Sequence, residues 1–215
     1  LGSFQANVWY AVLAATIIGI PFGITAFRLE RVGKAVFFFV NMVQTIPSLA
    51  LFGLLVAPVS ALSMKLPFLR EIGVRGIGWA PAFLALTLYA LLPVTRTTYT
   101  SLAMIDPAML EAGLGLGLTR RQVTVRIEIP LSSPVILSGI RTSLVQAIGN
   151  TVVAALIGGG GFGTFVFQGF GQAVGDLILL GAIPVIILAV IIDRLMALLI
   201  SLITPKGLTL QGGRG

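Results

Sequence analysis

Residues 177–203 read LILLGAIPVIILAVIIDRLMALLISLI, and only Asp193 and Arg194 in this run carry a charge. A helix needs about 20 predominantly apolar residues to cross the roughly 30 Å hydrocarbon core of a bilayer. The run is longer than that and contains a single proline, Pro184. It therefore predicts a membrane-spanning helix, which makes lipid the main solvent of this part of the chain.

Four further apolar runs precede it and predict spans over about 8–27, 35–57, 81–94 and 134–157. Pro47 is expected to break the backbone hydrogen-bond ladder partway through the second of them. A glycine-rich turn at 158–163 ends the fourth, and 165–175 is predicted as a re-entrant or loop stretch. We expect one transmembrane domain over 1–215, an all-α polytopic bundle with about five spans.

The composition excludes most other classes of protein. Of the 215 residues, 57% are apolar and 10% are charged, far from the balance of a soluble domain. Cysteine and histidine are both absent, which removes thiol chemistry, the commonest general base and the commonest zinc ligand. We expect no catalytic residue and no metal site, so an enzyme is disfavoured.

The formal net charge of +7 does not indicate nucleic acid, because the basic residues are scattered singly between apolar runs. They indicate orientation instead, since lysine and arginine near span ends favour the cytoplasmic side. Five spans give one face with few basic residues (Lys65, Arg70 and Arg75) and one with many: Arg28, Arg31, Lys34, Arg96, Arg120, Arg121, Arg126, Arg194, Lys206 and Arg214. The second face is predicted to be cytoplasmic.

The only long segment of mixed polarity, 96–130, then lies in the cytoplasm, while 158–175 lies outside. Within segment 96–130, Asp106 followed by Pro107 is typical of a helix start, with a capping acid and proline at the first helical position. We predict a short surface helix over 106–119. An amphipathic surface helix that its glycines merely terminate is the plainest interpretation of this segment.

The spacing within the same segment is more specific. Glu111, Ala112 and Gly113 are followed by Gly117 and, ten residues later, by Ile127, with Ile129 and Pro130 closing the run. This resembles the EAA signature of permeases from binding-protein-dependent ABC importers: Glu-Ala-Ala, three residues, Gly, nine residues, Ile, one residue, Leu-Pro. Gly113 stands for the second Ala and Ile129 for Leu, and the spacing is unchanged.

The resemblance implies a MetI-like permease fold in the bacterial cytoplasmic (inner) membrane, with helix 106–119 as the coupling helix. It implies three protein partners besides the lipid bilayer: a cytoplasmic ABC ATPase, a second permease copy or homologue, and an extracytoplasmic substrate-binding protein. ATP and Mg would be bound by the ATPase, and no cofactor by this chain. The residues implied in coupling are Asp106, Glu111, Ala112, Gly113, Gly117, Ile127 and Pro130.

Three further stretches resemble the glycine betaine, carnitine and choline branch of these permeases: 41–49 (NMVQTIPSL), 89–96 (YALLPVTR) and 139–163 (GIRTSLVQAIGNTVVAALIGGGGFG). The branch implies a quaternary amine osmoprotectant such as glycine betaine or choline. An ABC importer for amino acids such as methionine shares the signature and stays an alternative. A secondary transporter working without ATP is a second alternative, although Asp176 and Asp193 lie near span ends and no carboxylate lies mid-membrane.

Polar side chains inside spans are costly in lipid and mark either a transport pathway or interhelical hydrogen bonds. The candidates for a translocation path are Gln44, Thr45 and Pro47 in the second predicted span and Gln146, Asn150 and Thr151 in the fourth. Both interpretations stay open for the polar side chains among them. Arg141, near the cytoplasmic end of its span, is predicted to act as a structural tether paired with a carboxylate such as Glu128 or Asp193, or to snorkel inward.

Overall fold

The computed structural model describes residues 2–204, and every regular element in that range is helical. Leu1 and the predicted polar tail from Pro205, with Lys206 and Arg214, lie outside the described residues. The elements are α1 (Gly2–Arg28), α2 (Glu30–Thr45), α3 (Ser48–Lys65), α4 (Pro67–Glu71), α5 (Trp79–Ala103), α6 (Pro107–Gly115), α7 (Arg120–Val123), the π-helical turn η1 (Thr124–Glu128), α8 (Ile129–Ala154), the 3₁₀ turn η2 (Ala155–Ile157), α9 (Gly163–Gln172) and α10 (Gly175–Ile203).

Five of these helices are long and apolar enough to cross a membrane. They are Asn7–Arg28, Ser48–Lys65, Trp79–Ala103, Gly175–Ile203 and the continuous helix Arg120–Ile157, which joins α7, η1, α8 and η2. The predicted all-α, five-span fold class is therefore confirmed.

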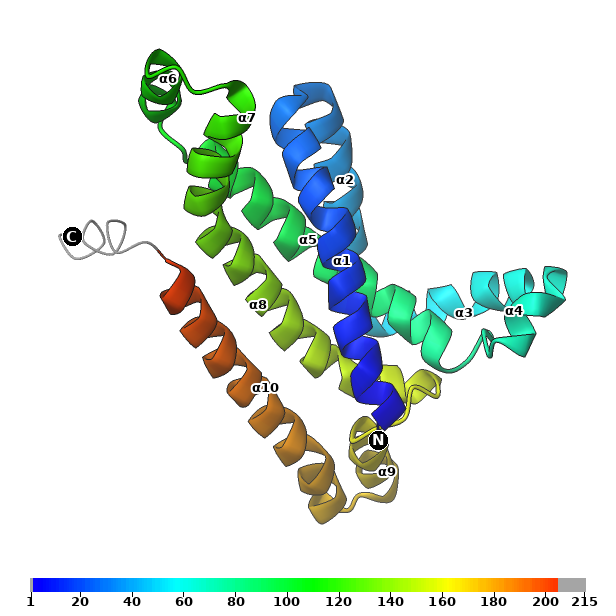
Figure 1. The fold of residues 1–215 in the computed structure, drawn as a ribbon. Helices are drawn as coiled ribbons and strands as arrows, with labels where there is room; N and C mark the ends of the chain where they lie inside the picture. Colours follow the sequence, from blue (N-terminus) through cyan, green and yellow to red (C-terminus); the bar gives the residue numbers. More distant parts are fainter. Residues whose placement is uncertain (1, 205–215) are drawn as a thin grey trace.

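The helix α5 lies at the centre of the bundle, packed against α1 and α8 and more lightly against α2 and α3 (Figure 1). The helix α10 lies at the edge of the bundle and packs mainly on α8 and α9. Figure 1 also shows that α6 and α7 lie at the same end as the α1–α2 junction, whereas α4 and α9 lie at the other end. The loop charges predict that the α6 end is cytoplasmic.

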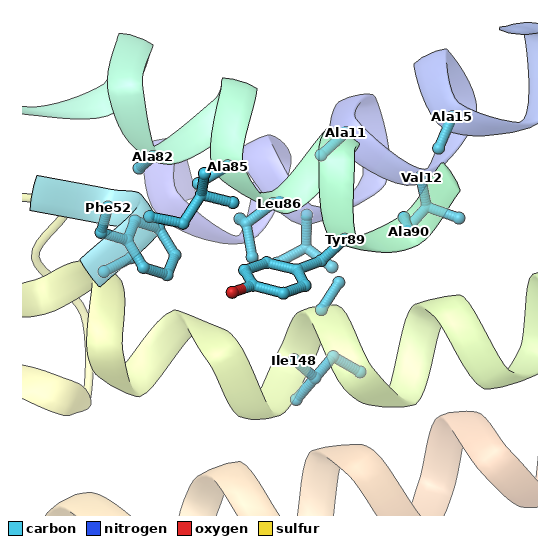
Figure 2. Packing of buried hydrophobic residues seen from close by; sticks show 14 of the residues in the cluster. Ala11, Val12, Ala15, Phe52, Ala82, Ala85, Leu86, Tyr89, Ala90 and Ile148 are labelled. Atoms are coloured by element: carbon cyan, nitrogen blue, oxygen red, sulfur yellow. The ribbon is translucent and has the colours of Figure 1, made fainter. Parts of the chain in front are cut away.

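Small residues let the central helices approach closely. Figure 2 shows Leu86 and Tyr89 of α5 between the alanines of α1 and Ile148 of α8. Where α1 crosses α5, a Cβ added to Gly23 would lie 2.7 Å from the backbone oxygen of Thr95. Gly19, one turn earlier, is similarly close to Val94. In lipid, such close packing is the main force that holds helices together.

The predicted second span, 35–57, is wrong as a single helix. The chain turns at Ile46 and Pro47, and α2 and α3 are separate helices on either side. Two hydrogen bonds connect the turn to α5. Gln44 Nε2 donates to the Tyr89 carbonyl at 3.0 Å, and the Tyr89 hydroxyl donates to the Ile46 carbonyl. The Tyr89 carbonyl is free because Pro93, four residues later, has no N–H to donate.

Two other predicted boundaries are also wrong. The third span does not end at 94, because α5 continues through Arg96 to Ala103. Its polar last turns stay helical since Thr98 and Ser101 are buried and their hydroxyls donate to helix carbonyls at 2.8 Å. The stretch 165–175, predicted as re-entrant or loop, is mostly the helix α9.

Candidate functional site

The helix α6 begins as predicted but ends earlier than 119. Asp106 is its N-cap, with Oδ1 accepting from the Ala108 N–H at 2.9 Å, and Pro107 occupies the first turn. The helix ends at Gly115, and Gly117 adopts a left-handed φ of +83° that turns the chain. Glycine reaches that conformation without the steric penalty of a Cβ. Thr119 and Gln122 then form a reciprocal capping box that starts α7.

The spacing between Gly113 and Ile127 has a direct structural reason. Gly113 is the buried residue of α6, and a Cβ placed there would lie 2.8 Å from Cδ1 of Ile127 and 3.4 Å from Cγ2 of Val123. Ile127 belongs to η1, the π-helical turn that leads into α8. Pro130 follows η1 directly, inside the continuous helix Arg120–Ile157, where it has no N–H to donate to the preceding turn. The two halves of the sequence signature therefore pack on one another.

The other side of α6 is exposed. Glu111, Ala112 and Gly117 are all exposed, and the Glu111 side chain makes no hydrogen bond or ion pair with any residue in 7–204. Beside this packing contact, a recess of about 530 Å³ lies between α6 and the neighbouring helix ends. Leu110 and Leu114 of α6 line it together with Arg28, Arg120, Arg121, Val123, Thr124 and Glu128. The helix thus combines one buried anchor with a free acidic face.

A second polar feature lies deeper, between α8 and α10. Arg141 donates from Nε and Nη2 to the two carboxylate oxygens of Asp193, at 2.6 and 2.5 Å. Of the two predicted partners for Arg141, the structure therefore selects Asp193. The pair borders a recess of about 320 Å³ together with Ser138, Thr142, Val145 and Gln146. A bidentate pair of this kind fixes the geometry between two helices.

The predicted path residues fall into two groups. Gln146 is exposed and Asn150, one turn later on the same face of α8, is half-buried. Thr151 is buried and its hydroxyl donates to its own helix, at the Ile148 carbonyl. No hydrogen bond among the described residues joins these three side chains to the second group, which is Gln44, Thr45 and Pro47.

In that second group, Gln44 is half-buried and is engaged with the Tyr89 carbonyl, as described above. Thr45 is exposed and donates to the Met42 carbonyl at 2.7 Å, and Pro47 lies exposed at the turn. Gln44 therefore has a structural partner on α5, whereas the Gln146 side chain makes no hydrogen bond with any residue in 7–204.

Two residues on this face of α8 were not predicted from the sequence. Ser138 and Thr142 border the same recess as Gln146, and the three follow one another at intervals of four residues. That spacing places side chains on one face of a helix, so the signal was present in the sequence. Tyr89 was missed as well, because its role depends on a contact with α2 that only the fold creates.

Residues 11–204 match the model of the family described as binding-protein-dependent transport system inner membrane component. The chain belongs to this family. It is therefore a multi-pass permease subunit of the inner membrane, and the alternative of a secondary transporter working without ATP is overturned.

Relatives of known role agree. The glycine betaine/carnitine/choline transport system permease protein OpuCB of Bacillus subtilis (strain 168) is 40% identical over 92% of this chain and 84% of its own length. The osmoprotectant import permease protein OsmW of Salmonella typhimurium is 38% identical over 96% and 92%. The predicted resemblance to this branch is confirmed.

Among solved structures, the chain is similar to a structure of the MetNI methionine ABC transporter, with a TM-score of 0.77, 20% identity, and coverage of 94% of this chain and 93% of the other. At that identity the likeness concerns the fold, and it confirms the predicted MetI-like architecture. The described residues contain no group of three or more acidic, histidine or cysteine side chains placed to hold a metal ion.

Proposed function

We propose that this permease passes a quaternary amine osmoprotectant, such as glycine betaine or choline, through a path shared with a second permease copy. The support is the consistent naming of relatives that are 36–40% identical over most of the chain. The methionine alternative has only a common fold behind it, at 20% identity. A separate extracytoplasmic binding protein would deliver the solute.

The driving ATPase, which binds ATP and Mg, would dock on α6. The observation that carries this is the division of α6 into two sides: Gly113 is packed against Ile127, and Glu111 with Ala112 is exposed and unpartnered within the described residues. Small residues allow a partner groove to approach closely, and a carboxylate suits a basic residue in it.

A push on α6 would then travel along one rigid element. Ile127 receives the contact from Gly113 and lies inside the continuous helix Arg120–Ile157. π-helical turns inside α-helices are frequent at functional sites, and η1 is the turn that contacts α6. Farther along, the Arg141–Asp193 pair couples α8 to α10. Movement of α6 would therefore tilt α8 and carry α10 with it.

The polar face of α8 is the best candidate for the path. Thr142 and Gln146 are exposed in this chain, and polar side chains of membrane helices avoid lipid in favour of protein or water-filled cavities. Their exposure in a single copy supports a second copy opposite them, with the solute passing between. The interhelical interpretation suits Gln44 better, since its amide already has a partner on α5.

Docking can be tested with single cysteines, because the 215 residues contain none of their own. Ala112→Cys on α6 should form a bismaleimide cross-link to a cysteine placed in the groove of the co-expressed ATPase. Ala61→Cys, also at an exposed position but on α3, is the control and should stay uncross-linked. Two results would contradict docking at α6. One is equal cross-linking of the two variants, and the other is the absence of a cross-link between Ala112→Cys and any cysteine placed along the ATPase groove.

The solute class can be tested by ATP hydrolysis in proteoliposomes that contain the permease, its ATPase and its binding protein. Glycine betaine, choline, carnitine, proline and methionine are added one at a time. Stimulation by the quaternary amines alone is expected. Stimulation by methionine or proline alone would contradict the solute class while leaving the permease role intact.

A further inference from the structure

An apolar groove in the bundle shares no lining residue with the recess that Gln146 borders. It has a volume of about 480 Å³ and lies where α1, α5 and α8 meet, near the end of α10. Its walls include Ile20 and Ile24 of α1, Leu102 of α5, and Ile136 and Ile140 of α8. The volume is within the range of sites that hold small molecules.

Of the four hydroxyls that line the groove, those of Thr98, Ser132 and Ser133 are satisfied by their own helices, whereas that of Thr124 is not. Thr98 donates to the Val94 carbonyl at 2.8 Å, Ser132 to the Ile129 carbonyl at 3.3 Å, and Ser133 to the Pro130 carbonyl at 3.2 Å. They have no need of a polar ligand. The groove therefore presents an apolar surface, which suits a hydrocarbon chain.

The dimensions fit one leaflet of a bilayer. Along α8 the groove extends from Ile129 to Ile140, which is about 17 Å at 1.5 Å per residue. Half of the roughly 30 Å hydrocarbon core is about 15 Å. The groove thus begins at the cytoplasmic end predicted from the loop charges and ends near the middle of the membrane.

The mouth of the groove is basic. Arg28 and Glu128 line both the groove and the neighbouring recess, which adds Arg120 and Arg121. These three arginines are exposed, and none makes an ion pair with a side chain in 7–204. Three arginines against one carboxylate leave an excess of positive charge at the level of lipid headgroups, where guanidinium groups bind phosphate well.

We propose that this groove is a binding site for an anionic phospholipid, with an acyl chain between α1 and α8 and the phosphate at Arg28, Arg120 and Arg121. The chain's own tail fits less well, although Ile203 borders the groove. Residues 205–215 add Lys206 and Arg214 and no acidic residue, so their charge has the same sign as the mouth.

The test is native mass spectrometry of the full chain, purified and incubated with equal amounts of phosphatidylglycerol and phosphatidylcholine that carry identical acyl chains. Arg28→Gln/Arg120→Gln/Arg121→Gln is compared with Arg31→Gln/Arg96→Gln/Arg126→Gln. Both triple variants remove three cytoplasmic-end charges, but only the first set borders the groove or its recess. A third variant, Ile136→Trp, fills the groove without changing charge.

We expect the wild type and the second triple variant to retain phosphatidylglycerol over phosphatidylcholine by about tenfold or more, since each basic residue near a membrane surface adds severalfold. The first triple variant should lose this preference, and Ile136→Trp should retain less of both lipids. Equal loss in the two triple variants would overturn the proposal in favour of diffuse surface charge. Displacement of phosphatidylglycerol by inorganic phosphate would also overturn the proposal and would indicate a site for a soluble anion. Stronger lipid retention after truncation at Thr204 would overturn it too, because it would indicate that the tail occupies the groove.

Discussion

The helices α5 and α10 both cross the membrane, yet their surroundings are opposite. Of the most apolar 18-residue window in each helix, 56% is buried inside the protein in α5 and 6% in α10. The more apolar helix is the more exposed one, since α10 has the highest mean hydropathy of the five spans and α5 the lowest. In a water-soluble protein, the more apolar of two helices would be the more buried one.

The difference follows from the solvent. Lipid tails are as apolar as leucine, so burial of apolar surface gives no driving force between helices inside a bilayer. The centre of this bundle is instead held by small residues at close crossings and by hydrogen bonds, such as those of Gln44 and Ser143 to carbonyls of α5. The comparison predicts that mutations at α5 contacts destabilise the fold and that equivalent mutations on α10 do not.

The largest effect is expected from Gly139→Leu, where α8 crosses α5. A Cβ at this position would lie 2.9 Å from the Pro93 carbonyl oxygen and would overlap the hydroxyl of Thr97. We expect a loss of about 3 kcal/mol or more in stability, or no folded protein at all. Gly149→Leu on the same helix is the control, because nothing lies within 4 Å of its added Cβ. Thermal unfolding in detergent, followed by size-exclusion chromatography, measures both, and equal melting temperatures would refute the close crossing.

Such crossings also explain which parts of the fold were predictable. Hydropathy located the spans because a long apolar run has few alternatives to crossing a bilayer. It predicted one span over 35–57 because Pro47 leaves the apolar composition unchanged, although the chain forms two separate helices, α2 and α3, on either side of it. It also ended α5 too early, since polar residues such as Thr98 and Ser101 are typical of loops, whereas the fold buries both of them.

The site was predictable to a similar degree. Spacing alone identified Gly113 and Ile127 as members of one motif, and the fold supplies the reason, a direct contact. Spacing left Arg141 with two possible carboxylates, because the choice between them depends on how α10 packs on α8. The helix α9 was missed since three glycines in GTFVFQGFGQ lower its helix propensity, while Gly163 and Gly169 are needed for close contacts with neighbouring helices.

A smaller effect is expected from Leu86→Ala in α5, compared with Ile187→Ala in α10. Leu86 is fully buried and Ile187 is 53% exposed. Leu86→Ala should cost about 2 kcal/mol, in the lower part of the usual range, because the cavity remains but the transfer from water does not apply in lipid. Ile187→Ala should shift the melting temperature in the same detergent by no more than the measurement error. A larger loss from Ile187→Ala would break the contrast between the two helices.

The smallest effect is expected from Gln44→Leu, which leaves the Tyr89 carbonyl without a donor. Hydrogen bonds between membrane helices contribute about 0.5–1.5 kcal/mol, so a modest fall in melting temperature should follow. Gln146→Leu, on the open face of α8, is the matched substitution and should leave the melting temperature unchanged while impairing transport. The reverse pattern would assign Gln44 to the path and Gln146 to the fold.

Co-purification of the ATPase with a permease altered on α6 tests the central claim most directly. The variant is Glu111→Lys/Gly117→Trp, and its control is Glu71→Lys/Gly73→Trp at the opposite end of the bundle. The two pairs match in residue type and in backbone strain, since Gly117 and Gly73 have φ of +83° and +81°. We predict that only the α6 variant loses the ATPase while both insert normally into the membrane. Undiminished co-purification with the α6 variant would contradict the claim that α6 connects this permease to its energy source.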